Sequence, residues 1–297
     1  MTRCIWRREG SDLFSMEMAD SIIHRLEECM TRPGPFQGEL YTGIDLGTAY
    51  MVLTVVDSLG NPVAASYRFA QVVRDGIVVD FTGATSILRE LKAELEAKLG
   101  TELIKAAGAF PPDTGQSTVK SHFYVCEGAG FEVINMIDEP TAANNVLGIT
   151  NGAVVDIGGG TTGIAVIQDG EVVITADEPT GGTHFSLVIA GAQKMTFEEA
   201  EDFKKRPENQ KEVMLMVKPV VQKVASIIKS KIRGYDVKSI YLVGGTCCLE
   251  GIEKVIENEL HIPTFKPTDP LLVTPLGIAL SCLEVNGIES RDVEAYH

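Results

Sequence analysis

One strand–turn–strand pattern occurs twice in this chain. It appears first as "GIDLGTAYMVLTVVD", from Gly43 to Asp57, and again as "VVDIGGGTTGIAVIQDG", from Val154 to Gly170. In each copy a strand ends in an aspartate, a glycine-containing turn with a threonine follows, and a second strand returns. Such a repeat predicts two similar α/β halves that face each other, with the two turns on opposite walls of one cleft.

The rest of the chain alternates between strand and helix patterns. Runs rich in β-branched residues predict strands at 41–47, 50–57, 62–69, 104–110, 131–137, 151–158, 161–168, 171–177 and 239–245. Apolar residues three and four apart predict helices at 85–99, 116–130, 138–148, 185–192, 196–205, 212–232, 248–260 and 274–285. Asp169 and Gly170 predict a tight hairpin turn in the second repeat.

Residues 1–39 differ from the regular pattern that follows them. The stretch "SDLFSMEMADSIIHRLEECM" predicts a helix with a ragged apolar stripe, and "TRPGPFQG" after it is typical of a linker. A stripe containing Ile22, Ile23, Leu26 and Met30 most often packs on the body of its own protein. The alternative is a docking helix for a partner's groove, in which case residues 1–36 are not needed for the fold.

Charge and apolar content exclude several functional classes. The formal net charge of −15 disfavours binding to nucleic acid or to an anionic membrane surface. No apolar run is long enough to span a bilayer, and the first residues lack the apolar core of a signal peptide. The six cysteines form no metal-binding or disulfide pattern. We therefore expect a cytoplasmic protein.

The glycine turns are the first candidates for a binding site. Consecutive glycines let backbone N–H groups converge on an anion, since no Cβ blocks the approach. Candidate phosphate-binding residues in the two turns are Gly47, Thr48, Gly158, Gly159, Gly160, Thr161 and Thr162. One such turn is equally typical of a tight hairpin, but two matching turns with aligned aspartates favour a polyphosphate. Asp45 and Asp156 would then need a cation between them and the phosphates, and Mg²⁺ held through water suits that position.

Three further candidates are weaker alone. The turn of Gly244, Gly245 and Thr246 lies between a strand and a helix, where it can back an adenine ring or simply join the two elements. Glu201 and Lys204 share a helical face, either as a surface ion pair or as ligands of ribose hydroxyls. Glu139 lies at a strand–helix junction, where it can orient water or complement the helix dipole.

The order of these motifs resembles a known superfamily. "GIDLGTAY", "IDEPTAA", "VVDIGGGTT" and "IYLVGGT…LEGIEKV" together resemble the actin/Hsp70/MreB ATPases, and the resemblance covers Tyr41 to about Val285. Within that superfamily, "VVRDGIVVDF", "ADEPTGGTHFSL" and "VKPV" are similar to the ethanolamine-utilisation protein J family, the chaperone-like member of ethanolamine operons. The chain is identified as a member of that family on these motifs.

The resemblance implies a two-lobed actin-like ATPase fold, a duplicated ribonuclease-H-like α/β architecture. Lobe I would comprise residues 40–144 plus 271–290, lobe II residues 145–270, and residues 1–39 an N-terminal arm and linker. The cofactors implied are ATP or ADP and Mg²⁺. The implied catalytic residues are Asp45 and Asp156, which hold the hydrated metal, and Glu139, which polarises the attacking water. The turns match the phosphate loops, Glu201 and Lys204 the ribose pair, and Gly244, Gly245 and Thr246 the adenosine loop.

The chain departs from the superfamily pattern in three ways. Gly163 stands where Hsp70 and MreB carry another acid beside the metal shell. The inserted subdomain that carries an active-site lysine in Hsp70 is replaced by the short stretch 71–79, and the second inserted subdomain is also trimmed. We expect no peptide-binding domain of the Hsp70 type. These departures favour retained nucleotide binding with weakened hydrolysis.

Three functions follow from the resemblance. The first is an ATP-binding, slowly hydrolysing chaperone-like or assembly factor of ethanolamine utilisation, with protein clients or partners from the ethanolamine operon and a possible bacterial microcompartment association. The second is a non-catalytic nucleotide-binding scaffold that recruits a partner, as in pilus-assembly or cell-division relatives. The third, a small-molecule kinase, is disfavoured by "DEPTAA" and by the trimmed lobes.

Overall fold

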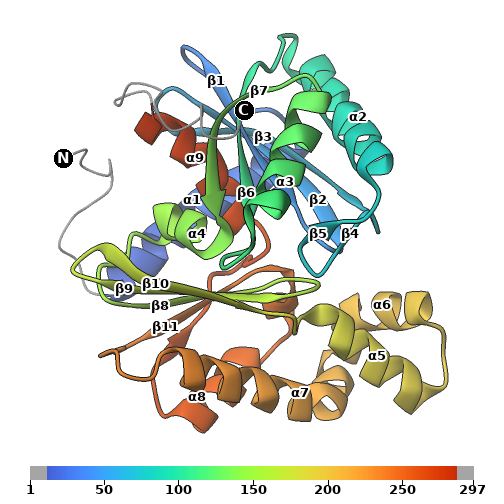
Figure 1. Cartoon of the computed structure of the whole chain (residues 1–297), viewed down its shortest axis with the longest axis vertical. Helices are drawn as coiled ribbons and strands as arrows, with labels where there is room; N and C mark the ends of the chain where they lie inside the picture. The colour runs from blue at the N-terminus through green and yellow to red at the C-terminus, as the bar shows by residue number, and fades with distance from the viewer. Residues whose placement is uncertain (1–11, 286–297) are drawn as a thin grey trace.

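The computed structural model of the protein describes residues 12–285 (Figure 1). It contains two five-stranded sheets, one above the other in Figure 1, with helices on the outer side of each sheet and further helices between them. Within this part of the chain, no helix is long and apolar enough to cross a membrane.

The first sheet has the order β3-β2-β1-β6-β7. Its strands are β1 (Leu40–Leu46), β2 (Tyr50–Asp57), β3 (Pro62–Phe69), β6 (Lys105–Phe110) and β7 (Glu132–Asp138). Helices α2 (Phe81–Leu99) and α3 (Gln116–Gly128) pack on one face. Leu88, Leu91 and Leu95 of α2 are fully buried there because they recur at helical spacing.

The second sheet has the order β10-β9-β8-β11-β12. Its strands are β8 (Gly152–Ile157), β9 (Thr162–Gln168), β10 (Glu171–Glu178), β11 (Ile240–Val243) and β12 (Thr264–Phe265). The helices of this half are α5 (Gly182–Gln193), α6 (Phe197–Lys205), α7 (Gln210–Lys231) and α8 (Ile252–Leu260). Short 3₁₀ helices η1 (Pro207–Asn209) and η2 (Gly245–Cys248) complete it.

The two sheets have the same topology. In each, the first three strands form an antiparallel meander, the fourth strand pairs in parallel with the first, and the fifth pairs in parallel with the fourth. This confirms the duplicated α/β fold that the repeated motif predicts. Each aspartate of the repeat, Asp45 and Asp156, lies near the end of the central strand of its sheet.

Two helices cross between the sheets. They are α4 (Glu139–Leu147), which leads from the first sheet to the second, and α9 (Val273–Val285), which returns. The crossing has no spare room, because a Cβ added to Gly277 would overlap the carbonyl oxygen of Ala142. The Asn145 side-chain amide also donates to the Gly277 carbonyl at 3.2 Å. The chain thus passes from one half to the other at a tightly packed helix crossing.

The N-terminal helix belongs to the body of the protein. Helix α1 (Asp12–Thr31) packs beside β3, with Ala19, Ile23 and Leu26 fully buried in the cluster that also contains α4 and α9. Its Asp20 accepts a hydrogen bond from the Thr268 backbone N–H at 2.8 Å. The docking-peptide alternative is therefore wrong for residues 12–31, because their apolar stripe already has an intramolecular partner. Residues 1–11 of the expected arm lie outside the described residues.

The Leu26→Ala substitution is expected to destabilise the protein by about 2–5 kcal/mol, because it leaves a cavity in a fully buried site. Met18→Ala on the same helix is the matched control, since Met18 is 37% exposed, and it should cost much less. Urea denaturation followed by circular dichroism measures both. Deletion of residues 1–36 should lower the melting temperature further. A deletion protein that melts like the intact chain would show that α1 is dispensable.

A small hairpin occupies the stretch that connects β3 to α2. It consists of β4 (Val73–Arg74) and β5 (Ile77–Val78), with Asp75 and Gly76 both at positive φ in the turn. Aspartate followed by glycine suits such a turn, because both tolerate the left-handed region. The sequence predicts 71–79 only as a short stretch in place of an insert, and the hairpin within it is seen in the structure.

Candidate functional site

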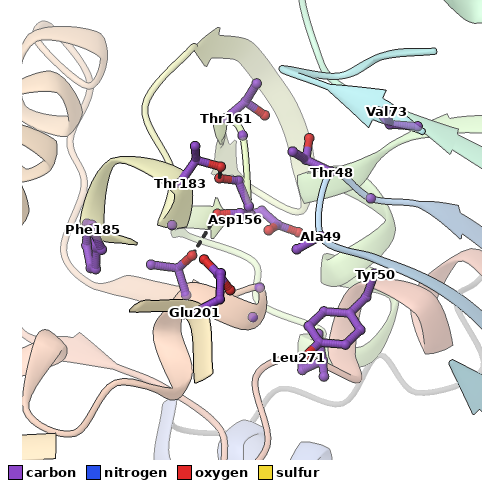
Figure 2. Close-up of a pocket in the computed structure, with 18 of the residues that line it drawn as sticks. Thr48, Ala49, Tyr50, Val73, Asp156, Thr161, Thr183, Phe185, Glu201 and Leu271 are labelled. Atoms are coloured by element: carbon purple, nitrogen blue, oxygen red, sulfur yellow. Dashed lines mark hydrogen bonds between the residues drawn. The ribbon is translucent and has the colours of Figure 1, made fainter. Parts of the chain in front are cut away.

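A cavity of about 860 Å³ lies between the two sheets (Figure 2). Both glycine turns reach it, so the two copies of the repeat contribute to one cleft, as predicted. All but one of the candidate residues line it, namely Asp45, Gly47, Thr48, Glu139, Asp156, Gly158, Gly159, Gly160, Thr161, Glu201, Lys204, Gly244, Gly245 and Thr246. Figure 2 shows Thr48 and Thr161 approaching from opposite halves.

Thr162 is the exception. It is fully buried, and its hydroxyl donates to the Thr180 carbonyl at 2.5 Å instead of reaching the cavity. The reason is strand geometry, because Thr162 is the first residue of β9 and neighbouring side chains of a strand point to opposite faces. A direct hydroxyl contact from Thr162 to a ligand, expected from the sequence, is therefore wrong, whereas Thr161 keeps access.

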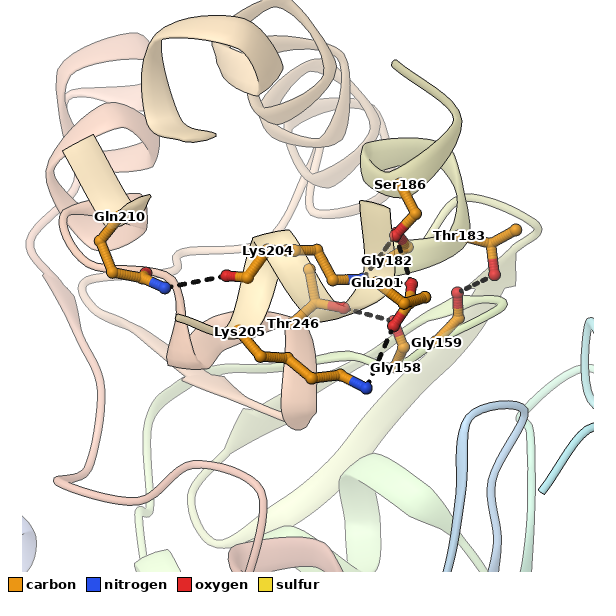
Figure 3. Close-up of polar contacts among 10 residues, drawn as sticks. All are labelled: Gly158, Gly159, Gly182, Thr183, Ser186, Glu201, Lys204, Lys205, Gln210 and Thr246. Atoms are coloured by element: carbon orange, nitrogen blue, oxygen red, sulfur yellow. Dashed lines mark hydrogen bonds and ion pairs between the residues drawn. The ribbon is translucent and has the colours of Figure 1, made fainter. Parts of the chain in front are cut away.

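The second glycine turn is held in shape by two elements behind it (Figure 3). The Gly158 carbonyl accepts from the Thr246 hydroxyl at 2.7 Å and from the Gly182 N–H at 3.0 Å. The Gly159 carbonyl accepts from both the N–H and the hydroxyl of Thr183, at 2.8 and 2.9 Å. These bonds tie the turn to η2 and to the start of α5. Groups of the protein itself thus hold the shape of the turn, as in most ligand-binding sites.

The two turns touch across the cleft. A Cβ added to Gly160 would lie 2.6 Å from the Thr48 hydroxyl and 2.9 Å from backbone atoms of Asp75. Since real Cβ contacts are longer, only glycine permits this approach. The tip of the β4–β5 hairpin therefore lies directly against the second turn.

Three carboxylic acids lie beneath the turns. Burial, together with the negative charge of Asp156, raises the pKa of Asp45 to about 7. Burial raises the pKa of Asp156 to about 6, although a hydrogen bond from the Thr274 hydroxyl favours its charged form. Burial and then the charges of Asp156 and Asp45 raise the pKa of Glu139 well above its usual value. A cation bound among these three acids would favour their charged forms.

This donor set fits a hydrated divalent cation. Carboxylate oxygens are the ligands that Mg²⁺ prefers, and Mg²⁺ usually retains several waters in protein sites. Among residues 12–285, no three acidic, histidine or cysteine side chains converge closely enough to hold a metal directly. A Mg²⁺ ion held by Asp45 and Asp156 through water agrees with both observations.

A fourth acid, Asp177, was missed in the sequence. In the strand ladders, Gly163 of β9 lies opposite Asp156 of β8 on one side and opposite Asp177 of β10 on the other. Burial raises the pKa of Asp177 to about 7, with a hydrogen bond to Thr161 opposing the rise and the charge of Asp156 adding to it. Position 163 carries no acid, but Asp177 on the neighbouring strand β10 supplies one at the paired position of the sheet.

Gly163 itself has little room. A Cβ at this position would lie 3.3 Å from ring carbons of both Pro112 and Pro140. The replacement of Gly163 by aspartate would therefore have to displace two proline rings. This makes Gly163→Asp a poor test of whether an acid here accelerates hydrolysis.

Glu201 and Lys204 form the ion pair that their spacing on α6 predicts, with 2.6 Å between nitrogen and oxygen (Figure 3). Ser186 of α5 hydrogen bonds to Glu201, and the Lys204 ammonium donates to the Ser186 hydroxyl at 2.7 Å and to the Gly182 carbonyl at 3.2 Å. Burial acts to raise the pKa of Glu201, but Lys204 and Ser186 hold it below its usual value. Glu201 therefore faces the cavity as a charged acceptor.

Lys205 spans the mouth of the cleft. Its ammonium lies 5.1 Å from the ring centre of Tyr50 and 4.9 Å from that of Phe69, both in the first half of the protein. It also lies 3.5 Å from a carboxylate oxygen of Glu201. Cation–π contacts of this kind contribute roughly 0.5–2 kcal/mol. They join α6 to the edge of the first sheet on the side away from the α4–α9 crossing (Figure 1).

Comparison with known proteins fits this arrangement. Residues 135–270 match the family described as type IV pilus assembly protein PilM. The chain is 42% identical over 254 residues to ethanolamine utilization protein EutJ of Salmonella typhimurium, which covers 85% of this chain and 89% of that protein. The chain belongs to the EutJ family. The family resemblance deduced from the motifs is thereby confirmed.

Solved structures place the EutJ family within a wider fold. The crystal structure of ethanolamine utilization protein EutJ from Carboxydothermus hydrogenoformans is 47% identical, with a TM-score of 0.84 over 89% of this chain and 99% of that one. MreB5 of Spiroplasma citri bound to ADP is 18% identical, with a TM-score of 0.68 over 84% of this chain and 98% of that one. The two-lobed actin-like ATPase fold expected from the sequence is confirmed.

Proposed function

We propose that this protein binds ATP and ADP with Mg²⁺ in the cleft, hydrolyses ATP slowly, and acts as a chaperone-like or assembly factor in ethanolamine utilisation. The observation that carries the proposal is the meeting of two glycine turns over Asp45 and Asp156. Buried acids with a raised pKa would be stabilised in their charged form by a cation, and the neighbouring turn can bind an anion. A magnesium–nucleotide complex supplies both.

Each group of lining residues is proposed to bind a different part of the nucleotide. The turns around Thr48 and Gly159 would bind the phosphates, and Thr161 would add a hydroxyl. Glu201 would accept hydrogen bonds from ribose hydroxyls, held in place by Lys204 and Ser186. The Gly244–Thr246 turn would back the adenine ring. Mg²⁺, when bound, supplies positive charge that offsets the phosphates and the acids.

Glu139 is the residue proposed to orient the attacking water. Burial and the charges of Asp156 and Asp45 raise the pKa of Glu139 well above its usual value and so favour its protonated form, whereas positive charge in the cleft would favour its charged form. A protonated acid cannot accept a proton from water, so Glu139 would function only when the cleft is loaded. Slow turnover follows from this requirement.

A non-catalytic scaffold is the second candidate. Its support is the match of residues 135–270 to a pilus assembly family, because the neighbouring structure of the PilM–PilN type IV pilus biogenesis complex contains such a protein with its partner. Partners from the ethanolamine operon and a microcompartment association belong to either version. Phosphate release without a co-substrate distinguishes the two candidates, since only the first predicts it.

Gly159→Val is expected to abolish nucleotide binding, because a Cβ at this position already lies 3.1 Å from Ala49 and a larger side chain would fill the phosphate turn. Isothermal titration calorimetry with ATP and with ADP, with and without Mg²⁺, measures the effect. Gly191→Val is the control, since a Cβ at Gly191 meets no atom within 4 Å. If the folded wild-type protein gives no heat with either nucleotide, the proposal fails.

A further inference from the structure

Arg74 presents an uncommitted positive charge to the cleft. It ends β4 in the hairpin, is exposed, and lines the cavity. Within residues 12–285 its side chain forms no ion pair or hydrogen bond. An arginine without a partner beside a phosphate-sized turn is available to a ligand.

The two lysine side chains that line the cavity already have partners within the protein. Lys204 is paired with Glu201 at 2.6 Å and also bonds to Ser186 and Gly182. Lys205 lies between Glu201 and the rings of Tyr50 and Phe69. In the described part of the chain, Arg74 is therefore the one lysine or arginine lining the cavity whose charge is not already engaged.

The hairpin that carries Arg74 is anchored from behind. One ring nitrogen of His122 lies 3.0 Å from the Gly76 carbonyl oxygen, and the other lies 2.8 Å from that of Ala109 on β6. His122 is almost fully buried, and Gly76 packs so closely on Pro111 that an added Cβ would overlap the proline ring. The hairpin is thus fixed to the first sheet before any ligand arrives.

The place of the β4–β5 hairpin determines which part of a bound nucleotide Arg74 can contact. The backbone of Asp75, the next residue, lies against Gly160 of the second turn. Val73, the preceding residue, lines the same cavity as Thr48 of the first turn (Figure 2). The Gly244–Thr246 turn, proposed for the adenine ring, follows β11 in the second half. Arg74 is therefore next to the site where the two phosphate turns meet.

We propose that Arg74 binds the terminal phosphate of ATP and so makes the cleft discriminate between nucleoside triphosphate and diphosphate. This inference rests on the proposed function and adds a residue that no sequence motif assigned to the site. The guanidinium group suits this role because it binds two phosphate oxygens in parallel and stays charged at any working pH.

Arg74→Gln is expected to weaken ATP binding about 10- to 100-fold, the range of one charge-assisted contact, while ADP binding changes less than about twofold. Arg74→Lys should recover only part of the loss, because an ammonium group cannot bind in the bidentate manner. Arg233→Gln is the control, since Arg233 is exposed and does not line the cavity. Calorimetry with ATP–Mg²⁺ and ADP–Mg²⁺ on the full chain gives the ratio of affinities.

The outcomes separate the inference from the proposed function. A wild-type protein that binds neither nucleotide contradicts both. A wild-type protein that binds ATP, together with an Arg74→Gln variant of unchanged ATP-to-ADP ratio, overturns only the inference. Equal weakening of both nucleotides also overturns it, because the contact would then not involve the terminal phosphate. Unchanged melting temperatures show that the variants are folded, as expected for an exposed side chain.

Discussion

Replacing Gly277 with alanine is expected to destabilise the protein by more than about 4 kcal/mol, a large share of the stability of an ordinary domain. The added methyl group would overlap the Ala142 carbonyl oxygen, which belongs to the backbone of α4 and cannot swing aside. The two helices would have to separate, and the buried cluster that they share with α1 would lose its packing. Urea denaturation measures the change.

Gly191→Ala provides a matched control for that experiment. Gly191 also lies in a helix, α5, but an added Cβ there meets no atom within 4 Å. Alanine is favoured over glycine inside helices by about 1 kcal/mol, so this variant should be as stable as the wild type or slightly more so. The same substitution is thus expected to lower the stability at Gly277 and to preserve or raise it at Gly191. A Gly277→Ala protein as stable as the wild type would contradict the described crossing.

Asp45→Asn is expected to stabilise the ligand-free protein at pH 8 by about 1–3 kcal/mol while abolishing Mg²⁺-dependent nucleotide binding. In the folded protein the pKa of Asp45 is about 7, against 3.8 for the ordinary group. Between these values the folded state binds the proton and the unfolded state does not, so the contribution of Asp45 to stability is present at low pH and lost as pH rises through 7. Asparagine does not ionise, so the Asp45→Asn protein does not lose this stability as the pH rises.

The pH profile makes this prediction specific. The difference in melting temperature between Asp45→Asn and the wild type should be several degrees at pH 8 and close to zero at pH 4, where both side chains are neutral. Asp236→Asn is the control, because Asp236 is an exposed surface acid and should give a small, flat difference. An Asp45→Asn difference that does not grow between pH 4 and pH 8 would show that folding does not raise the pKa of Asp45.

Much of the site could be predicted because each motif fixes its own local geometry. Asp45 and Asp156 end the central strands of their halves, and the repeat alone places those strand ends on one cleft. The prediction for Thr162 was wrong because it depends on the residue at which β9 begins, and a shift of one residue reverses the face. Motif matching cannot resolve that single residue.

Asp177 was unpredictable for a related reason. A regular antiparallel ladder that starts at the Asp169–Gly170 turn would pair Ala176 of β10 with Gly163 of β9. A bulge between Val172 and Ile174 shifts the register by one and places Asp177 there instead. The partners of Lys205 and the place of Arg74 in the cavity depend on how the two halves approach each other, which no local pattern encodes. The burial of α1 was foreseen as one alternative, since its apolar stripe needed some partner.

Helices α4 and α9 and the helix that carries Lys205, α6, lie on different sides of the molecule (Figure 1), and they join the two halves in different ways. At the crossing, backbone lies on backbone and both chain connections between the halves pass. At α6, one flexible side chain lies against two rings. The two halves are thus joined through backbone at the crossing and through side chains around Lys205. Any rotation of one half about the crossing would therefore disturb the side-chain contacts of Lys205 more than the contacts of the crossing itself.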